Sequence, residues 1–172
     1  IIMIISNNIF ISIGSNLRGH MNNSKDIMNI VFFNLSNEGL RVRSASKIYI
    51  SKPIPSGLGP TFYNRVILIK SDLNPVYILS RLKKIEKIYS QRSFLRNSPR
   101  VLDLDILDYK GKVIKNSQYL QTPHPRMVNR DFILKPLHDL NPNWIHPISG
   151  KNIKNLLYKC KRSNISIAKA IY

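Results

Sequence analysis

Hydrophobic and polar residues alternate along the first half of the chain in a regular order of strands and helices. Residues 9–13 alternate as a buried strand does, and the run stops at the turn-forming residues Gly14-Ser15-Asn16. Ser24 is a good N-cap, and Gly39 stands where the following helix is expected to end. The helix stripe predicted to face the core consists of Ile27, Ile30, Val31 and Leu35. Residues 40–50 then predict a second strand.

The same order repeats after a loop at residues 51–60, which contains three prolines and two glycines. Phe62 to Ile69 predicts a strand with Phe62, Asn64, Val66 and Leu68 on one face. Asn74-Pro75 starts a helix, because a cap residue precedes a proline suited to its first turn. The stripe predicted for this helix is Val76, Leu79, Leu82 and Glu86.

A basic, unpatterned stretch at residues 90–100 leads into a further strand, and Lys110-Gly111-Lys112 then predicts a hairpin turn. A short helix is expected from Ser149 to about Leu157. The order from residue 9 to residue 107 is strand, helix, strand, strand, helix, strand. This is the βαββαβ arrangement of ferredoxin-like α/β domains, in which helices pack on the sheet.

The strand after the basic stretch carries the candidate chemistry, in the segment Pro99-Arg100-Val101-Leu102-Asp103-Leu104-Asp105-Ile106. Alternate side chains of a strand share a face, so Asp103 and Asp105 face one side and the apolar residues face the other. Paired carboxylates repel one another unless a cation lies between them, and Mg²⁺ is the usual hard cation for such oxygen ligands. Taken alone, the segment is also typical of an edge strand with a solvated outer face.

Composition indicates one globular domain, residues 1–172, with a full hydrophobic core, since 43% of the residues are hydrophobic. The sequence has no apolar run of membrane-spanning length, and Cys160 is the only cysteine, which excludes an internal disulfide. The apolar first residues lack the basic segment of a secretory signal. A reducing, cytoplasmic location fits these features.

Basic residues outnumber acidic residues by 27 to 9, which gives a formal net charge of +18. Such a surplus attracts polyanions, whether nucleic acid, nucleotide phosphates or anionic membranes. The lysines and arginines are spread along the chain, so charge alone does not indicate a nucleic-acid interface.

Three segments together resemble the signatures of the 6-hydroxymethyl-7,8-dihydropterin pyrophosphokinase family. They are Ile13-Gly14-Ser15-Asn16-Leu17, the Asp103-Asp105 segment, and Pro123-His124-Pro125-Arg126-Met127 followed by Arg130 and Phe132. They occur in the family's order and spacing. The resemblance covers about residues 9–157 and leaves a C-terminal tail at 158–172.

The resemblance implies a ferredoxin-like fold and transfer of pyrophosphate from ATP to the hydroxymethyl oxygen of the dihydropterin, with release of AMP, in folate synthesis. It implies two Mg²⁺ ions held by Asp103 and Asp105, and ATP as co-substrate. It also implies a monomer in the cytoplasm with small-molecule substrates and no nucleic-acid or membrane partner.

The resemblance also assigns roles to individual residues. Arg100, Asp103, Asp105 and Arg92 match its catalytic residues, with Arg92 and Arg96 on a loop that closes over ATP. The ATP-binding set is Arg92, Arg96, Arg100, Ile106, His124 and Arg130. The pterin-binding set is Gly14, Ser51, Lys52, Ile54, Phe62, Asn64 and Phe132. Glu86 matches a retained glutamate that is expected to be structural or to hold the basic loop.

The chain departs from the family pattern at three places: Ser90-Gln91 replaces Gly-Arg, Asn97-Ser98 replaces an aromatic residue and Gly, and Ser51-Lys52 replaces Thr-Pro. The altered loop residues are expected to weaken loop closure rather than abolish metal binding, which predicts a working but slow enzyme. Two other functions stay open: a ferredoxin-like nucleic-acid-binding module, and a pterin- or nucleotide-binding protein that has lost turnover.

Overall fold

The computed structural model describes residues 7–16, 24–51, 61–89, 102–115, 120–162 and 168–171. Its strands are β1 (Ile9–Ser15), β2 (Arg41–Ala45), β3 (Ile48–Ser51), β4 (Phe62–Lys70), β5 (Asp103–Tyr109), β6 (Ile114–Lys115), β7 (Gln121–Thr122) and β8 (Lys169–Ile171). Its helices are α1 (Ser24–Asn37), α2 (Pro75–Tyr89), α3 (Asp131–Leu140) and α4 (Ile153–Arg162), with a 3₁₀ turn at Met127–Asn129.

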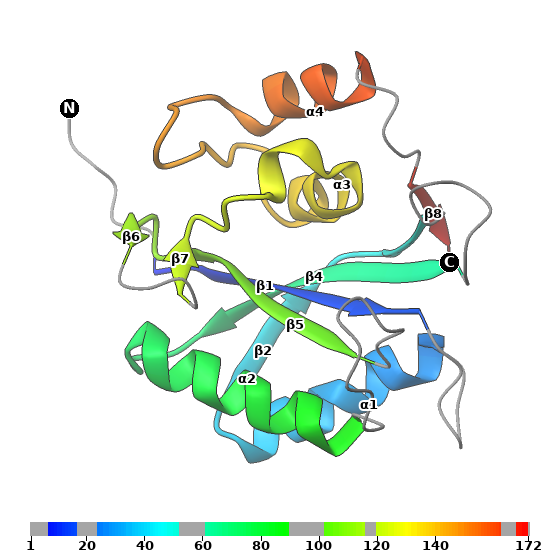
Figure 1. The fold of residues 1–172 in the computed structure, drawn as a ribbon, viewed down its shortest axis with the longest axis vertical. Coiled ribbons are helices and arrows are strands. Elements are labelled where there is room, and N and C mark those ends of the chain that lie inside the picture. Colours follow the sequence, from blue (N-terminus) through cyan, green and yellow to red (C-terminus); the bar gives the residue numbers. More distant parts are fainter. Residues whose placement is uncertain are drawn as a thin grey trace.

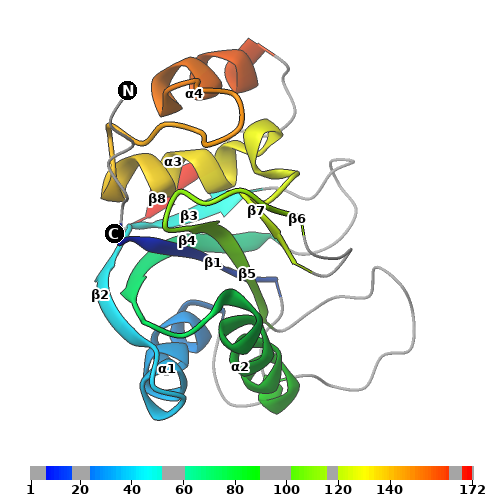
Figure 2. The same ribbon diagram turned by 90° about the vertical axis from the view of Figure 1, so that its left-hand side faces the viewer.

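A six-stranded antiparallel sheet forms the middle layer, in the order β5-β1-β4-β3-β8, with β2 also paired to β4. Helices α1 and α2 cover one face and α3 and α4 cover the other (Figures 1 and 2). The strand order β5-β1-β4 followed by β2 and β3 confirms the predicted ferredoxin-like βαββαβ fold. β5 is therefore an edge strand.

Two separate hydrophobic cores lie on the two faces of the sheet. The larger packs alternate residues of β1, β4 and β5, such as Ile11, Ile67 and Leu104, against α1 and α2. The smaller packs Phe10 and Val66 against α3 and α4. Because side chains alternate between faces, both cores follow from the period of two along each strand.

The second predicted strand is two strands, because Ser46 interrupts the run 40–50. The hydroxyl of Ser46 accepts a hydrogen bond from the Val66 backbone N–H at 3.0 Å. The Ser46 hydroxyl thus takes the place of a backbone carbonyl as the acceptor for Val66. Beyond this point the chain continues as β3, which pairs with the same strand, β4.

Helix positions also differ from the prediction. The buried residues of α2 are Ile78, Leu82 and Ile85, whereas Val76 is 48% exposed. Leu82 of the predicted stripe is thus confirmed and Leu79 packs against the same core, but Ile78 and Ile85 rather than Val76 complete the buried face.

In α1, Ile30 is 40% exposed and Met28 is buried in its place. The last helix begins at Ile153 rather than Ser149, because Asn152 accepts the Asn155 N–H at 2.9 Å and caps it.

Turn predictions are confirmed at two places. Gly39, two residues after the last residue of α1, has a φ of 73°, the left-handed conformation expected after a helix end. Lys110 and Gly111 have φ values of 56° and 69°, and Tyr109 pairs with Lys112 across the turn. Two successive left-handed residues are what a tight hairpin requires.

Candidate functional site

Asp103 and Asp105 lie on the sheet face that α3 covers, at the edge strand β5. Their cross-strand partners on β1 are Gly14 and Ser12. Leu104 lies between them and points to the opposite face, into the core under α1 and α2. The predicted sharing of one face by the two carboxylates is confirmed, and both side chains remain partly exposed.

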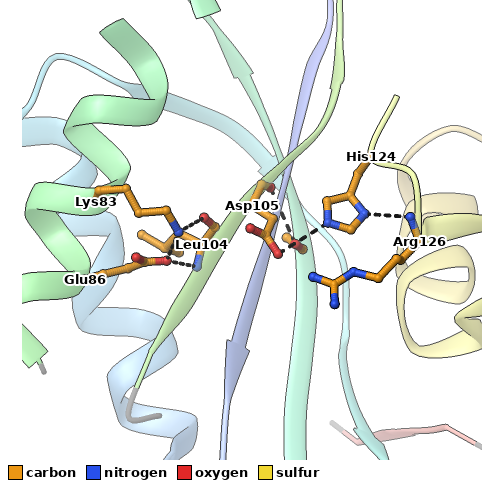
Figure 3. A network of polar contacts seen from close by, with 7 residues as sticks. Lys83, Glu86, Leu104, Asp105, His124 and Arg126 are labelled. Carbon is orange, nitrogen blue, oxygen red and sulfur yellow. Dashed lines mark hydrogen bonds and ion pairs between the residues drawn. The ribbon is translucent and has the colours of Figure 1, made fainter. Parts of the chain in front are cut away.

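The backbone between the two aspartates is fixed from the other side by Glu86 of α2. Glu86 Oε1 accepts the Leu104 N–H at 2.7 Å and pairs with Lys83 Nζ at 2.7 Å (Figure 3). Burial raises the pKa of Glu86, and the Lys83 ammonium and the Leu104 N–H oppose that shift. An edge strand has an unpaired row of N–H groups, so this contact satisfies one of them and ties α2 to the carboxylate strand.

His124 approaches the carboxylates from the turn that precedes the 3₁₀ segment. Its backbone N–H donates to the Leu107 carbonyl at 2.8 Å, and its Nε2 lies 3.8 Å from Asp105 Oδ2. Nδ1 accepts the Arg126 backbone N–H at 3.2 Å, which assigns the proton of the neutral ring to Nε2, facing Asp105. Burial lowers the pKa of His124, and the Asp105 carboxylate opposes that shift.

Two arginines add positive charge beside the carboxylates. Arg130 is partly buried, with its guanidinium carbon 5.6 Å from the centre of the Phe132 ring. Burial and the nearby Arg126 lower the pKa of Arg130, while Asp105 and Asp103 raise it. Figure 3 shows the exposed Arg126 side chain extending toward Asp105. Phosphate oxygens suit such a group of guanidinium donors.

A carboxamide lies on the same face, two strands away from Asp103. Asn64 of β4 is the cross-strand partner of Gly14, which is in turn the partner of Asp103. The amide thus lies two interstrand spacings, about 10 Å, from the strand that carries the carboxylates. The buried Asn64 Nδ2 donates to Ser51 Oγ at 3.2 Å. Phe62 precedes Asn64 on the same face.

Gly14 separates these two parts of the site. A Cβ atom built at this position would meet Asn64 Oδ1 at 3.5 Å and Asp103 Cβ at 3.9 Å. Glycine therefore adds no side chain of its own to the space between the amide and the carboxylates.

The structure brings eight of the predicted site residues to one face of the sheet, at its junction with α3. These are Asp103, Asp105, His124, Arg130, Gly14, Ser51, Phe62 and Asn64. Phe132 joins them through Arg130. Arg92, Arg96, Arg100, Lys52 and Ile54 lie outside the described residues. The Ile106 side chain is buried under α1 and α2, and its part in ATP binding stays a prediction.

The sequence interpretation gave no role to Lys83 or to Arg126. Lys83 lies three residues before Glu86, a spacing that places both side chains on the same side of a helix and is a usable signal. Arg126 lies within the His124 segment, but sequence alone does not show which way an exposed arginine points.

Asp103 and Asp105 fit a magnesium site by their chemistry and placement. Mg²⁺ is usually held by one or two carboxylates together with substrate phosphates and water, rather than by a full protein cage. Within the described ranges no group of three or more His, Cys, Asp or Glu residues could hold a metal ion. Two partly exposed carboxylates beside cationic side chains match the open type of site.

Comparison with known proteins identifies the family. The family model described as 7,8-dihydro-6-hydroxymethylpterin-pyrophosphokinase matches residues 10–142. The chain belongs to this family. The 2-amino-4-hydroxy-6-hydroxymethyldihydropteridine pyrophosphokinase of Aquifex aeolicus is 38% identical over 117 residues, which cover 68% of this chain and 72% of that protein.

Longer relatives contain the pyrophosphokinase-like part as one portion. The folic acid synthesis protein fol1 of Pneumocystis carinii is 38% identical over 151 residues, 88% of this chain but 20% of that protein. The chain thus spans about a fifth of such relatives. The fold matches a crystal structure of Plasmodium falciparum HPPK-DHPS, with a TM-score of 0.72 and 17% identity, over 96% of this chain and 49% of that one. No helix in the described part of the chain is long and apolar enough to cross a membrane.

Proposed function

We propose that this protein transfers pyrophosphate from ATP to the hydroxymethyl group of 6-hydroxymethyl-7,8-dihydropterin, releasing AMP, as a step of folate synthesis. The observation that carries the proposal is the shared sheet face of Asp103, Asp105 and Asn64. A phosphate-directed carboxylate pair and an amide suited to a heterocycle stand two strands apart, with Gly14 of β1 between them. Family membership supports the same reaction.

In this mechanism Asp103 and Asp105 would hold two Mg²⁺ ions, and Glu86 keeps the strand between them in place. When bound, the ions would supply positive charge that offsets the phosphate charge in the transition state. The pyrophosphoryl group moves directly from ATP to the pterin hydroxyl, so no protein nucleophile is needed. The hydroxyl oxygen attacks the β-phosphorus, the bond from that phosphorus to the oxygen bridging the α-phosphate breaks, this oxygen leaves on AMP, and the hydroxyl proton passes to water.

Cationic side chains complete the ATP site. Arg130 and Arg126 offer planar donors for the phosphates, and His124 presents its Nε2–H toward the same region. Arg92, Arg96 and Arg100 are proposed to add further contacts, with the loop excluding water that would compete with the pterin hydroxyl.

Pterin binding is assigned to the other end of the site. The Asn64 amide supplies polar partners for the heterocycle edge, and Phe62 and Phe132 supply rings for stacking. Ser51 fixes the Asn64 amide through their hydrogen bond. Lys52 and Ile54 are proposed to line the pterin edge. We further propose a cytoplasmic monomer with no nucleic-acid partner.

The test is a product assay with purified protein, ATP, Mg²⁺ and hydroxymethyldihydropterin, with AMP and ADP resolved. AMP is expected only when the pterin is present, and Asp103→Ala or Asp105→Ala should abolish it. Binding of both substrates without AMP would favour a protein that has lost turnover. Tight, steeply salt-dependent binding of RNA without AMP would favour a nucleic-acid-binding module.

A further inference from the structure

A buried polar contact joins the last described strand to the start of α3. The Ala168 N–H donates to Asp131 Oδ2 at 2.9 Å, and Lys135 Nζ donates to the Ala168 carbonyl at 2.7 Å. Lys135 Nζ also lies 3.0 Å from Asp131 Oδ2. Asp131 and Ala168 are 4% and 3% exposed, so the contact is inside the protein. We call Asp131, Lys135, Ala168 and β8 the C-terminal clamp.

The C-terminal clamp contacts both parts of the protein that form the proposed pterin site. Asp131 lies between Arg130 and Phe132, whose side chains contact each other. β8 follows Ala168 directly and pairs with β3. β3 ends at Ser51, the partner of the Asn64 amide. At the far end of α3, the Tyr49 hydroxyl of β3 donates to the Asp139 carboxylate at 3.1 Å.

The start of α3 depends on this contact for its orientation. Arg130 is the N-cap residue and has an extended backbone, and its side chain makes no capping hydrogen bond. Asp131, by contrast, is a buried carboxylate held by an ammonium and a backbone N–H. A buried charge must keep such partners, and their fixed positions therefore fix the first turn of the helix.

We propose that Asp131, acting through Lys135 and Ala168, is a positioning residue that sets Arg130 and Phe132 for the two substrates. The inference rests on the proposed function for the identity of those substrates. Supporting contacts of this kind matter because small displacements of binding groups change substrate affinity. The C-terminal clamp thereby gives residues 168–171 a part in substrate binding that the sequence does not suggest.

The test compares Ala168→Pro with Ala168→Ser in the full chain. Proline has no backbone N–H and so removes the hydrogen bond that Asp131 accepts, whereas serine keeps this N–H. Asp131→Asn is the second variant, because its amide oxygen still accepts but its charge is lost, and Asp72→Asn is an exposed control. Values of kcat, KM for the pterin and KM for ATP are measured at a temperature where circular dichroism shows every variant folded.

Ala168→Pro and Asp131→Asn are expected to raise KM for the pterin, through Phe132, and KM for ATP, through Arg130, each about 3- to 10-fold, the range carried by one hydrogen bond. Asp72→Asn should leave both KM values unchanged, and Ala168→Ser should change them less than Ala168→Pro does. A purely structural role would lower the active fraction, and thus kcat, with both KM values unchanged, and that result would overturn the proposal.

The design separates failure of this inference from failure of the proposed function. If the unaltered protein forms no AMP, the function fails, and dissociation constants for the pterin and for ATP with Mg²⁺, measured by calorimetry, replace KM. Weaker pterin binding in Asp131→Asn then supports the positioning role, and equal binding overturns it. If Ala168→Pro does not fold, Asp131→Asn alone decides.

Discussion

Glu86→Ala is the substitution that most directly tests how the carboxylate strand is held. Leu104 is fully buried, and its N–H would lose the acceptor that Glu86 provides at 2.7 Å. An unsatisfied buried donor costs about 1–3 kcal/mol. Loss of the pair with Lys83, whose side chain is 43% exposed, adds less than about 1 kcal/mol. We expect a loss of about 2 kcal/mol in the free energy of unfolding.

For a domain of this size, a loss of that magnitude lowers Tm by about 4–8 °C. Glu86→Gln is the matched comparison, because its amide oxygen still accepts the Leu104 N–H. Burial raises the pKa of Glu86, so the charged form is disfavoured in the folded protein and replacing it with a neutral amide removes that penalty. We expect Glu86→Gln to lie within about 1 kcal/mol of the unaltered protein.

The functional consequence follows from the position of Leu104 between Asp103 and Asp105. A less firmly held edge strand should raise the Mg²⁺ concentration that gives half-maximal AMP formation, more in Glu86→Ala than in Glu86→Gln. Lys83→Met keeps the Glu86–Leu104 hydrogen bond and serves as a control for the ion pair. Equal Tm values and equal Mg²⁺ requirements for the Ala and Gln variants would refute the reasoning.

Three further predictions concern the site and its surroundings. Gly14→Ala should fold normally, because its methyl group meets Asn64 Oδ1 at 3.5 Å, an ordinary contact. The methyl group should nevertheless raise KM for the pterin several-fold, because it fills the space between the two substrates. An unchanged KM would contradict this prediction. Arg126→Gln should raise KM for ATP about 10- to 100-fold, the range of one hydrogen bond to a charged group, while Arg41→Gln, exposed on β2, should not. Burial lowers the pKa of His146 below its usual 6.5. The neutral, buried side chain therefore contributes its full stabilisation above pH 6.5, and this stabilisation is lost as the pH falls through the lowered pKa. The free energy of unfolding, measured by urea titration, should therefore fall more between pH 7 and pH 5 in the unaltered protein than in His146→Phe. Parallel pH profiles of this free energy would show that His146 is not responsible.

Local patterns predicted the fold and the two aspartates because these features depend on residue alternation and turn chemistry. The period of two along 102–106 placed Asp103 and Asp105 on one face, and the structure confirms it. Gly39 and Lys110-Gly111 likewise marked a helix end and a hairpin turn through their backbone preferences. Such signals lie within a few residues of the feature they predict.

Features that depend on distant contacts were not predictable in this way. The β1–β5 register shifts between Phe10 and Ile11, so Asp108 pairs with Phe10 and accepts the Trp144 Nε1–H at 2.7 Å. Strict alternation would instead have placed Asp108 on the face of Leu104. The hydrogen bond from Ala168, just before β8, to Asp131 likewise joins residues 37 positions apart. A single sequence carries no local signal for either contact.

The central claim is pyrophosphoryl transfer at the Asp103–Asp105 face, and the most direct measurement is AMP formation with and without hydroxymethyldihydropterin. We predict that the unaltered protein forms AMP and pterin diphosphate in equal amounts, only with both substrates and Mg²⁺ present. Asp103→Asn and Asp105→Asn should abolish both products while the proteins remain folded. AMP formation that persists in both variants, or that does not require the pterin, would contradict the account.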